Sequence, residues 1–273
     1  MICIFSLIGK TTHNSGYTEI FNGSGQHLNF LRFSLLNLDR NFSKYSGYSG
    51  NEEIALVVIR GTVDVTVDSI FFYNIGRRNS AFESPPYTVY VPTDSHYNIE
   101  LSKNCVDAEV AICRSVAERH FEPFMINPEK VETVPRGKGQ WKRDVRNILV
   151  DNVNGMVDRI IMGETINSAG EWSGYPPHKH EENSPPNELP FEEIYYYLLD
   201  PPNGFGIQVH YGSKFEEDRG YVVKSGNAFA IPDGYHPVVA AGGYRLYYLW
   251  FMAGPAGRKL MPHLDPSHAW VEK

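Results

Sequence analysis

The two halves of this chain share a glutamate and a later histidine at the same separation, and this repeat constrains the fold more than any other feature. Glu53 and His96 lie 140 residues before Glu193 and His236, respectively. An apolar run follows each glutamate, and a proline stands four residues before each histidine. Repetition at one offset indicates two related domains, and 273 residues are enough for two domains of ordinary size.

Short apolar runs separated by Gly, Pro, Asn and Asp fill both halves, a pattern typical of all-β sandwiches and barrels. The 17 Tyr and 15 Phe also favour strands. The predicted strands are 28–35, 54–60, 63–67, 88–91 and 109–114, then 159–165, 193–199, 206–211, 220–223, 228–231 and 244–252. Two such units, each with a Glu and a later His, predict a bicupin, in which two jelly-roll β-barrels each enclose a space between their strands.

The predicted domain boundaries follow from the breaks in this pattern. Residues 1–127 form an N-terminal cupin-like barrel without a metal site, and residues 148–273 form a C-terminal barrel with one. Residues 128–147 are predicted to be a linker, because Pro135, Gly137 and Gly139 interrupt them. The irregular tail from Pro255 is expected to pack over the second barrel.

Charge and cysteine usage exclude several classes of protein. The net charge of −7 argues against nucleic acid as a partner. Three cysteines without a CxxC motif suggest a reduced, cytoplasmic compartment. The apolar start, residues 1–8, lacks a basic region and is predicted to be a strand rather than a signal peptide. The sequence contains no run of about 18 apolar residues, the length that a membrane-spanning helix needs.

The segment His178-Lys179-His180 has no counterpart in the first half, where Leu38 and Arg40 occupy the equivalent positions. In a strand, the two histidines would point to the same side and Lys179 to the other. This pair could also lie in a polar surface loop, but Glu193 and His236 can complete a metal cage with it. We therefore predict one divalent transition metal, with zinc preferred over manganese, iron or nickel.

The neighbouring Glu192 remains an alternative to Glu193 as a ligand. Alternation along a strand cannot decide between them without the register, and Glu52-Glu53 repeats the doublet in the first half. A second metal at Glu53 and His96 is not expected, because that half lacks the histidine pair.

At several further motifs the chain resembles the 5-deoxy-glucuronate isomerase family of myo-inositol catabolism. The motifs are Tyr175-Pro-Pro-His-Lys-His, Glu192-Glu-Ile-Tyr-Tyr-Tyr, Pro202-Asn-Gly-Phe-Gly, Gly234-Tyr-His-Pro-Val, Gly243-Tyr-Arg-Leu-Tyr-Tyr-Leu, Met252-Ala-Gly-Pro, Asp265-Pro-Ser-His-Ala-Trp and Pro85-Pro-Tyr-Thr-Val-Tyr-Val-Pro. That family is related to 4-deoxy-L-threo-5-hexosulose-uronate ketol-isomerase, in which the ligand Glu directly precedes an aliphatic-Tyr pair. The resemblance therefore favours Glu193, which precedes Ile194-Tyr195.

The resemblance implies that an aldose, 5-deoxy-D-glucuronate, is converted to a ketose, 5-dehydro-2-deoxy-D-gluconate. A metal would polarise the reacting oxygens, and either a base moves the C2 proton or a hydride shifts. Alternatives are the related hexuronate ketol-isomerase, a non-catalytic metal-stabilised sugar-binding bicupin and a cupin dioxygenase. A regulator is disfavoured, because the chain has no helix-turn-helix segment and no basic stripe.

Residues near the predicted cage are candidates for catalysis and substrate binding. Gln208 and His210 share one face of a strand, and Tyr248 could reach inward from another. A sugar-acid carboxylate calls for arginine, for which Arg245 and Arg219 are preferred. Arg143 and Arg146 are further options. The expected partner is a small sugar acid, without nucleic acid or membrane, and exposed β edges favour a homo-oligomer.

Overall fold

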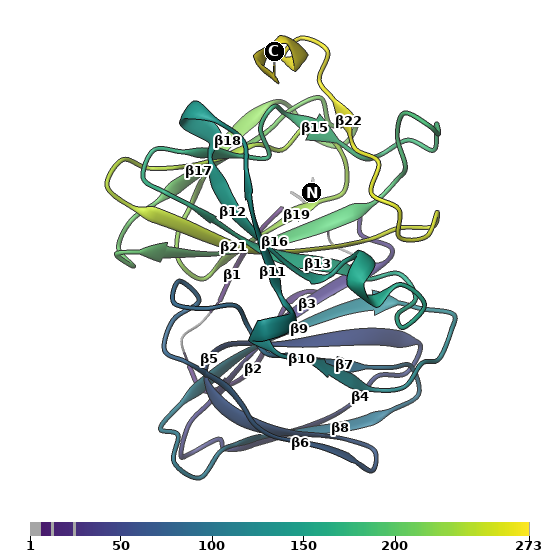
Figure 1. Cartoon of the computed structure of the whole chain (residues 1–273), viewed down its shortest axis with the longest axis vertical. Helices are drawn as coiled ribbons and strands as arrows, with labels where there is room; N and C mark the ends of the chain where they lie inside the picture. The colour runs from purple at the N-terminus through teal and green to yellow at the C-terminus, as the bar shows by residue number, and fades with distance from the viewer. Residues whose placement is uncertain (1–6, 12–13, 24–25, 273) are drawn as a thin grey trace, which may run out of the picture.

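Two stacked β units make up the computed structural model, which describes residues 7–11, 14–23 and 26–272 (Figure 1). Strands of the first half form the lower unit in that view, and strands of the second half form the upper unit. Helical structure among the described residues consists of short 3-10 turns: η1 (Pro128–Lys130), η2 (Gly139–Trp141), η3 (Asp151–Val153) and η4 (Ala269–Glu272). No helix among the described residues has the length and apolar character needed to cross a bilayer.

The first unit is a sandwich of two antiparallel layers that share one long strand. Its strands are β2 (Gly16–Phe21), β3 (Leu31–Leu38), β4 (Lys44–Tyr48), β5 (Glu52–Val67), β6 (Ile70–Arg78), β7 (Thr88–Val91), β8 (His96–Leu101), β9 (Ala108–Val116) and β10 (Phe124–Ile126). The start of β5 pairs with β7 and β9, and its end pairs with β6 and β8 in the other layer. The two strands predicted at 54–60 and 63–67 are therefore one.

The second unit has a large sheet in the order β1-β19-β16-β21-β13-β12-β11, faced by a small sheet in the order β14-β20-β17-β18. The bounds are β1 (Ile8–Lys10), β11 (Glu132–Arg136), β12 (Arg143–Leu149), β13 (Ile161–Asn167), β14 (Trp172–Ser173), β15 (His178–Lys179), β16 (Glu192–Asp200), β17 (Gly206–His210), β18 (Arg219–Val223), β19 (Asn227–Ile231), β20 (Val238–Ala240), β21 (Arg245–Ala253) and β22 (His263–Leu264). The two sheets face each other as an open sandwich, and the chain has the predicted all-β, double jelly-roll architecture.

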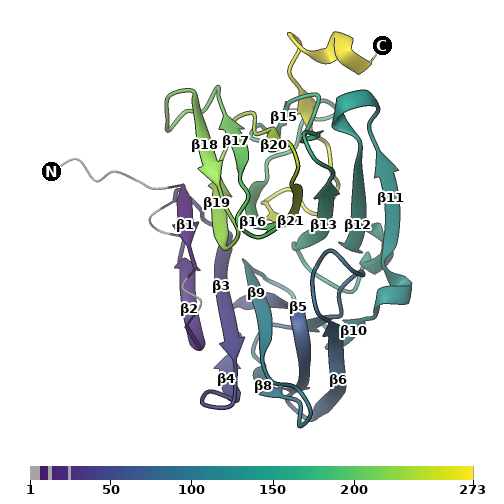
Figure 2. The ribbon, with the colours of Figure 1, turned by 90° about the vertical axis from the view of Figure 1, so that its left-hand side faces the viewer.

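One edge strand of the second unit comes from the start of the chain. β1 precedes all strands of the first unit, yet it pairs with β19 of the second unit (Figure 2). β10 follows β9 in the chain and pairs with β7 in the same, first unit. The strand predicted over 1–8 lies outside the described residues except for its last two, and β1 begins at Ile8.

The predicted linker of residues 128–147 is wrong, because it contains β11 and most of β12. Both strands extend the large sheet of the second unit, with Glu132 opposite Asn147 and Arg143 opposite Asn167. Pro135 was one reason to predict a linker here rather than a strand. It lies in β11 at the edge of the sheet, where a residue without an N–H group is tolerated.

The large sheet of the second unit has two different faces. Along β16, Ile194 and Tyr196 point to the first unit, and the Tyr196 ring packs against Phe33 at a centroid distance of 5.5 Å. Tyr195 and Tyr197 point the other way, into the second unit, because side chains alternate along a strand. One face of this sheet is therefore an interface between units, and the opposite face is available for a site.

Two carboxylates join the units by reciprocal contacts at this interface. Glu53 of the first unit accepts backbone N–H bonds of 2.6–2.8 Å from Asp158, Arg159 and Ile160, just before β13. Glu192 of the second unit accepts backbone N–H bonds from residues 29–31, just before β3. Each carboxylate thus satisfies buried backbone donors that have no strand partner.

Strand pairing corrects the register of the repeat. Val91 and Ile231 are 140 residues apart, as the repeat requires. Val91 pairs with Ile54, and Ile231 pairs with Glu193. The counterpart of Glu193 is therefore Ile54, whereas Glu53 corresponds to Glu192. A shift of one residue moves a side chain to the opposite face of a sheet, which the 140-residue spacing alone could not show.

A buried ionic cluster adds a second link between the units. Glu164 of β13 is fully buried and accepts bonds from Arg78 of the first unit at 2.7 Å and from Arg146 at 3.2 Å. The Tyr247 hydroxyl donates a further bond of 2.7 Å. Two guanidinium groups around one carboxylate are stable here only because every charge has a partner.

We expect Glu164→Gln to lower the free energy of unfolding by about 3–5 kcal/mol, because it leaves two buried guanidinium groups without a carboxylate. Glu100→Gln is the matched control, since Glu100 pairs with Lys44 on the surface, and its effect should stay below about 1 kcal/mol. Denaturant unfolding followed by circular dichroism measures both. Equal effects of the two variants would contradict the importance of the buried cluster.

Candidate metal centre and its cavity

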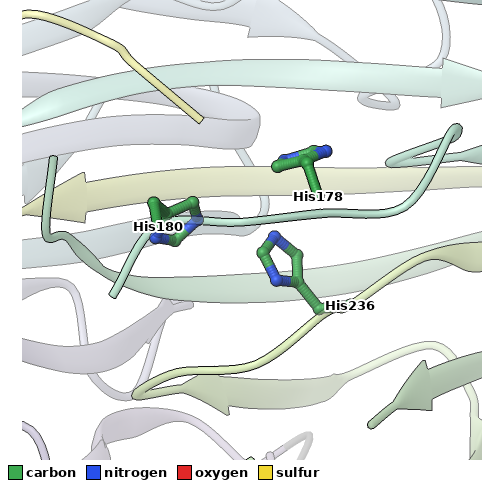
Figure 3. Close-up of side chains that lie close together, drawn as sticks. All are labelled: His178, His180 and His236. Carbon is green, nitrogen blue, oxygen red and sulfur yellow. The ribbon is translucent and has the colours of Figure 1, made fainter. Parts of the chain in front are cut away.

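Four side chains from three parts of the second unit converge behind the small sheet. His178 and His180 come from β15 and the residue that follows it, and His236 comes from the connection between β19 and β20 (Figure 3). One ring nitrogen from each histidine lies within 4.8 Å of the other two. A carboxylate oxygen of Glu193 lies 3.1 Å from His180 Nε2 and 3.2 Å from His236 Nε2. The structure thus brings together all four predicted ligands.

The backbone around each histidine explains why the rings meet. β15 pairs with β22, where His178 lies opposite Leu264, so the tail of the chain holds this short strand in place. His236 follows Gly234, which has a φ of +75° and sits so close to His210 that a Cβ atom would lie 3.0 Å from its Nε2. The positive φ and the lack of space for a Cβ atom both favour glycine at this turn.

Hydrogen bonds to backbone carbonyl groups set the orientation of two of the rings. His180 donates from Nδ1 to the Phe191 carbonyl at 2.7 Å, and His236 donates from Nδ1 to the Gly234 carbonyl at 2.9 Å. Each ring therefore turns its Nε2 toward Glu193 and the centre, the orientation that metal-binding histidines take. Among the described residues, His236 Nε2 is buried without a hydrogen-bond partner. An orphaned nitrogen of this kind fits a metal ion.

Electrostatics favour the protonation states that a metal requires at three of the four predicted ligands. Burial and the nearby His236 and His180 lower the pKa of His178 to about 3. Burial also lowers the pKa of His236, against the opposing effect of Glu193. Burial opposes the charge of Glu193, but the two nearby histidines lower its pKa to about 2. The carboxylate is therefore ionised at neutral pH and the His178 and His236 imidazoles are neutral, whereas at His180, despite burial, the close Glu193 carboxylate raises the pKa.

A cavity of about 350 Å³, here called the site cavity, is lined by three of the four predicted ligands, His178, His180 and Glu193. Its floor is the inward face of the large sheet, because alternate residues of β12, β13, β16 and β21 line it. The lining residues are Arg136, Arg143, Val145, Asn147, Val150, Thr165, Gly174, His178, His180, Phe191, Glu193, Tyr195, Tyr248, Trp250, Met252, Leu260, Met261 and Pro262. Size and mixed polarity suit one small polar metabolite.

One wall of the site cavity is apolar. The indole of Trp250 lies across its strand partner Gly163, where a Cβ atom would come within 2.3 Å of the ring. Leu260, Met261 and Pro262 of the tail complete this wall. The tail from Pro255 was expected to pack over the second barrel. In the structure, three of its residues help to enclose the site.

Tyr248 lines the site cavity as predicted. Its ring centroid lies 4.5 Å from that of Tyr195, and its hydroxyl forms a short hydrogen bond with Ser173. Burial raises the pKa of Tyr248 above its usual value, so the phenol keeps its proton. It can therefore donate a hydrogen bond but is a poor base.

The prediction that Gln208 and His210 act on substrate is not supported, because neither lines the site cavity. Gln208 accepts a bond from Tyr197 at 2.7 Å and donates one to the His236 carbonyl at 2.8 Å. His210 bonds through Nε2 to the Asp233 carbonyl at 2.7 Å. Both support the loop that carries His236. Strand alternation predicted that both side chains lie on the inward face of β17. It could not show that other side chains and loops fill the space in front of that face.

The arginine predictions need a similar correction. Arg219 and Arg245 are exposed and pair with Glu217 and Asp200, respectively, away from the site cavity. Arg146, a further option, lies on the interface face of the sheet with Glu164. The arginines that line the site cavity are Arg143 and Arg136. Arg143 was among the arginines predicted from sequence as further options, whereas Arg136 was not predicted.

Lys179 and the segment after it lie outside the cage. The Lys179 ammonium pairs with Glu181 at 2.5 Å, on the side of the strand away from the ligands, as alternation predicted. The inserted residues before Glu193 are ordered by Glu188, whose carboxylate accepts the backbone N–H groups of Glu181 and Glu182. The polar insertion is therefore a folded support beside the site.

The fold and this centre define a bicupin whose second unit has a histidine-carboxylate site that could hold a metal. The KduI/IolB family model matches residues 7–271, and the chain belongs to this family. A 5-deoxy-glucuronate isomerase of Geobacillus kaustophilus is 38% identical over 222 residues, which are 81% of this chain and 78% of that protein. The family and its relatives identify the chain as an isomerase.

Solved structures agree with the fold. An IolB-like protein of Salmonella typhimurium LT2 superposes with a TM-score of 0.91 and 32% identity, covering 98% of this chain and all of that one. An oxalate decarboxylase structure superposes with a TM-score of 0.61 at 11% identity, covering 94% of this chain and 76% of that one. The second likeness concerns the double-barrel fold alone.

We expect His178→Ala and His236→Ala to lower the amount of divalent metal that copurifies with the protein, because each removes one ligand of the cage. Elemental analysis of the purified variants measures this. His96→Ala is the control, since His96 is exposed and its ring contacts that of Tyr48 in the first unit, away from the cage. Unchanged metal content in the first two variants would overturn the proposed cage.

Proposed function

We propose that this chain is a metal-dependent aldose–ketose isomerase that converts 5-deoxy-D-glucuronate to 5-dehydro-2-deoxy-D-gluconate in myo-inositol catabolism. The observation that supports this most directly is the cage of His178, His180, His236 and Glu193, which opens onto a cavity of metabolite size. Relatives that bear the name 5-deoxy-glucuronate isomerase support the choice of substrate. Zinc is the preferred metal, by the chemistry of the ligand set.

The reaction moves one hydrogen from C2 of the aldose to C1, while the hydroxyl proton on O2 is lost and O1 gains one. The C1 aldehyde becomes a hydroxymethyl group and C2 becomes a carbonyl, so no external oxidant or reductant is needed. A divalent metal in the cage would act as a Lewis acid on the two reacting oxygens and stabilise negative charge that develops on them.

The protein's own residues would orient the sugar and shield it from water. Tyr248 keeps its proton and faces the site cavity, so it can donate a hydrogen bond to an oxygen of the sugar. Thr165 and Asn147 provide further polar groups on the same floor. Trp250 and Met261 offer an apolar surface for the carbon chain and exclude water from that side.

We expect metal-loaded protein to convert 5-deoxy-D-glucuronate and metal-stripped protein to lose this activity, with recovery when zinc is restored. Product formation followed by NMR measures the conversion. A folded, metal-loaded protein that leaves this sugar unchanged would refute the proposed substrate. Turnover of 4-deoxy-L-threo-5-hexosulose-uronate instead, in a parallel assay, would assign the chain to the related hexuronate reaction.

We expect Tyr248→Phe to lower kcat by about 10- to 100-fold with metal content unchanged, because it removes one hydrogen bond to the reacting sugar. Tyr244→Phe is the matched control, since Tyr244 does not line the site cavity. The same assay run in D2O detects a proton shuttle that exchanges with solvent, because such a shuttle places deuterium at C1 of the product.

Three further properties stay predictions. They are a cytoplasmic location, a sugar acid as the class of partner, and self-association through exposed strand edges. Sedimentation or light scattering of the purified protein tests the last of these.

A further inference from the structure

Two arginines face each other across the β11–β12 hairpin at the wall of the site cavity. Arg136 and Arg143 are directly opposite in the strand register, and both line the cavity. Like charges at opposite positions of a strand pair repel each other and destabilise the hairpin. Such a pair is expected where an anion can lie between the two charges and relieve the repulsion.

Neither arginine has a carboxylate partner in the part of the chain that the structure describes. Eight other arginines do have one: Arg60, Arg78, Arg114, Arg119, Arg146, Arg159, Arg219 and Arg245. Arg32, Arg40, Arg77 and Arg258 also lack a carboxylate partner among the described residues, but none of them lines the site cavity. Arg136 and Arg143 therefore stand apart because they combine an unneutralised charge with a place at the cavity.

The backbone holds Arg143 in place without neutralising it. Its Nη1 atom donates to the Trp141 carbonyl at 3.1 Å and to the Tyr175 carbonyl at 3.3 Å. Tyr175 shortly precedes the His178-Lys179-His180 segment, so Arg143 connects the hairpin to the strand that carries two cage ligands. The remaining guanidinium N–H groups are available to a ligand.

We propose that Arg143 and Arg136 bind the carboxylate of the substrate, so that the sugar acid lies with its carbonyl end at the cage and its acid end at the hairpin. This inference rests on the proposed function and deepens it. A guanidinium group can hold a carboxylate through two parallel N–H bonds, which fixes both position and direction. The pair therefore selects sugar acids over neutral aldoses that have the same carbonyl group.

Binding of D-glucuronate and of D-glucose to the metal-loaded protein, measured by calorimetric titration, tests this selection without requiring turnover. We expect the wild type to prefer glucuronate, and Arg143→Met to weaken glucuronate binding by about 10- to 100-fold. Arg136→Met is expected to act in the same direction, with a smaller effect because Arg136 is exposed. Glucose binding should change little in either variant.

Arg219→Met is the matched control, because it removes the same charge from an exposed strand and should leave glucuronate binding unchanged. Metal content and circular dichroism show that each variant keeps its cage and fold. In turnover of 5-deoxy-D-glucuronate, Arg143→Met should raise KM more than it lowers kcat. Arg143→Lys should recover part of the binding, since it restores the charge without the two parallel bonds.

Equal binding of glucose and glucuronate by the wild type would overturn the inference, and so would unchanged glucuronate binding in the Arg136→Met/Arg143→Met double variant. These results are distinct from failure of the proposed function. Arginine-dependent binding of glucuronate without turnover of 5-deoxy-D-glucuronate would refute the isomerase substrate alone. Turnover with unchanged KM in Arg143→Met would refute the carboxylate site alone.

Discussion

Side chains alternate along β16, and this alternation couples the interface between the units to the site. Glu192 points to the first unit and binds its backbone, whereas the adjacent Glu193 points into the second unit and faces three histidines. The same division continues with Ile194 and Tyr196 on one side and Tyr195 on the other. One strand therefore anchors the interface and forms part of the site, so the position of the ligand carboxylate depends on how the two units pack.

The first unit thus has a mechanical role even though it lacks the histidine pair. Its residues 29–31 hold Glu192, and its Arg78 helps to neutralise Glu164 on the back of the site floor. Catalytic geometry benefits from support of this kind, because ligands on a firmly packed sheet move less than ligands on loops. A two-unit chain can use one unit for chemistry and the other as a rigid base.

The metal cage was predictable because its signals are local: a His-x-His pair, a glutamate that begins a strand and a histidine after a Pro-x-Gly turn. Which glutamate of the doublet turns inward depends on register, which the sequence does not contain. Arg136 was missed because Pro135 beside it resembles a strand breaker, although an edge strand accepts proline. Gln208 and His210 were placed on the correct strand, but burial against the loop of His236 depends on packing that no sequence pattern reveals.

The pairing of β1 with the second unit affects how the chain can be assembled. Ile8 pairs with Phe229, so the sheet beneath the site cannot be completed until the ribosome has made most of the protein. The first unit also needs β10, which is made just before the second unit begins. A cut at the apparent boundary near residue 127 would therefore separate β1 from the sheet that it completes. The second unit made alone would then have an exposed edge strand that is open to intermolecular pairing.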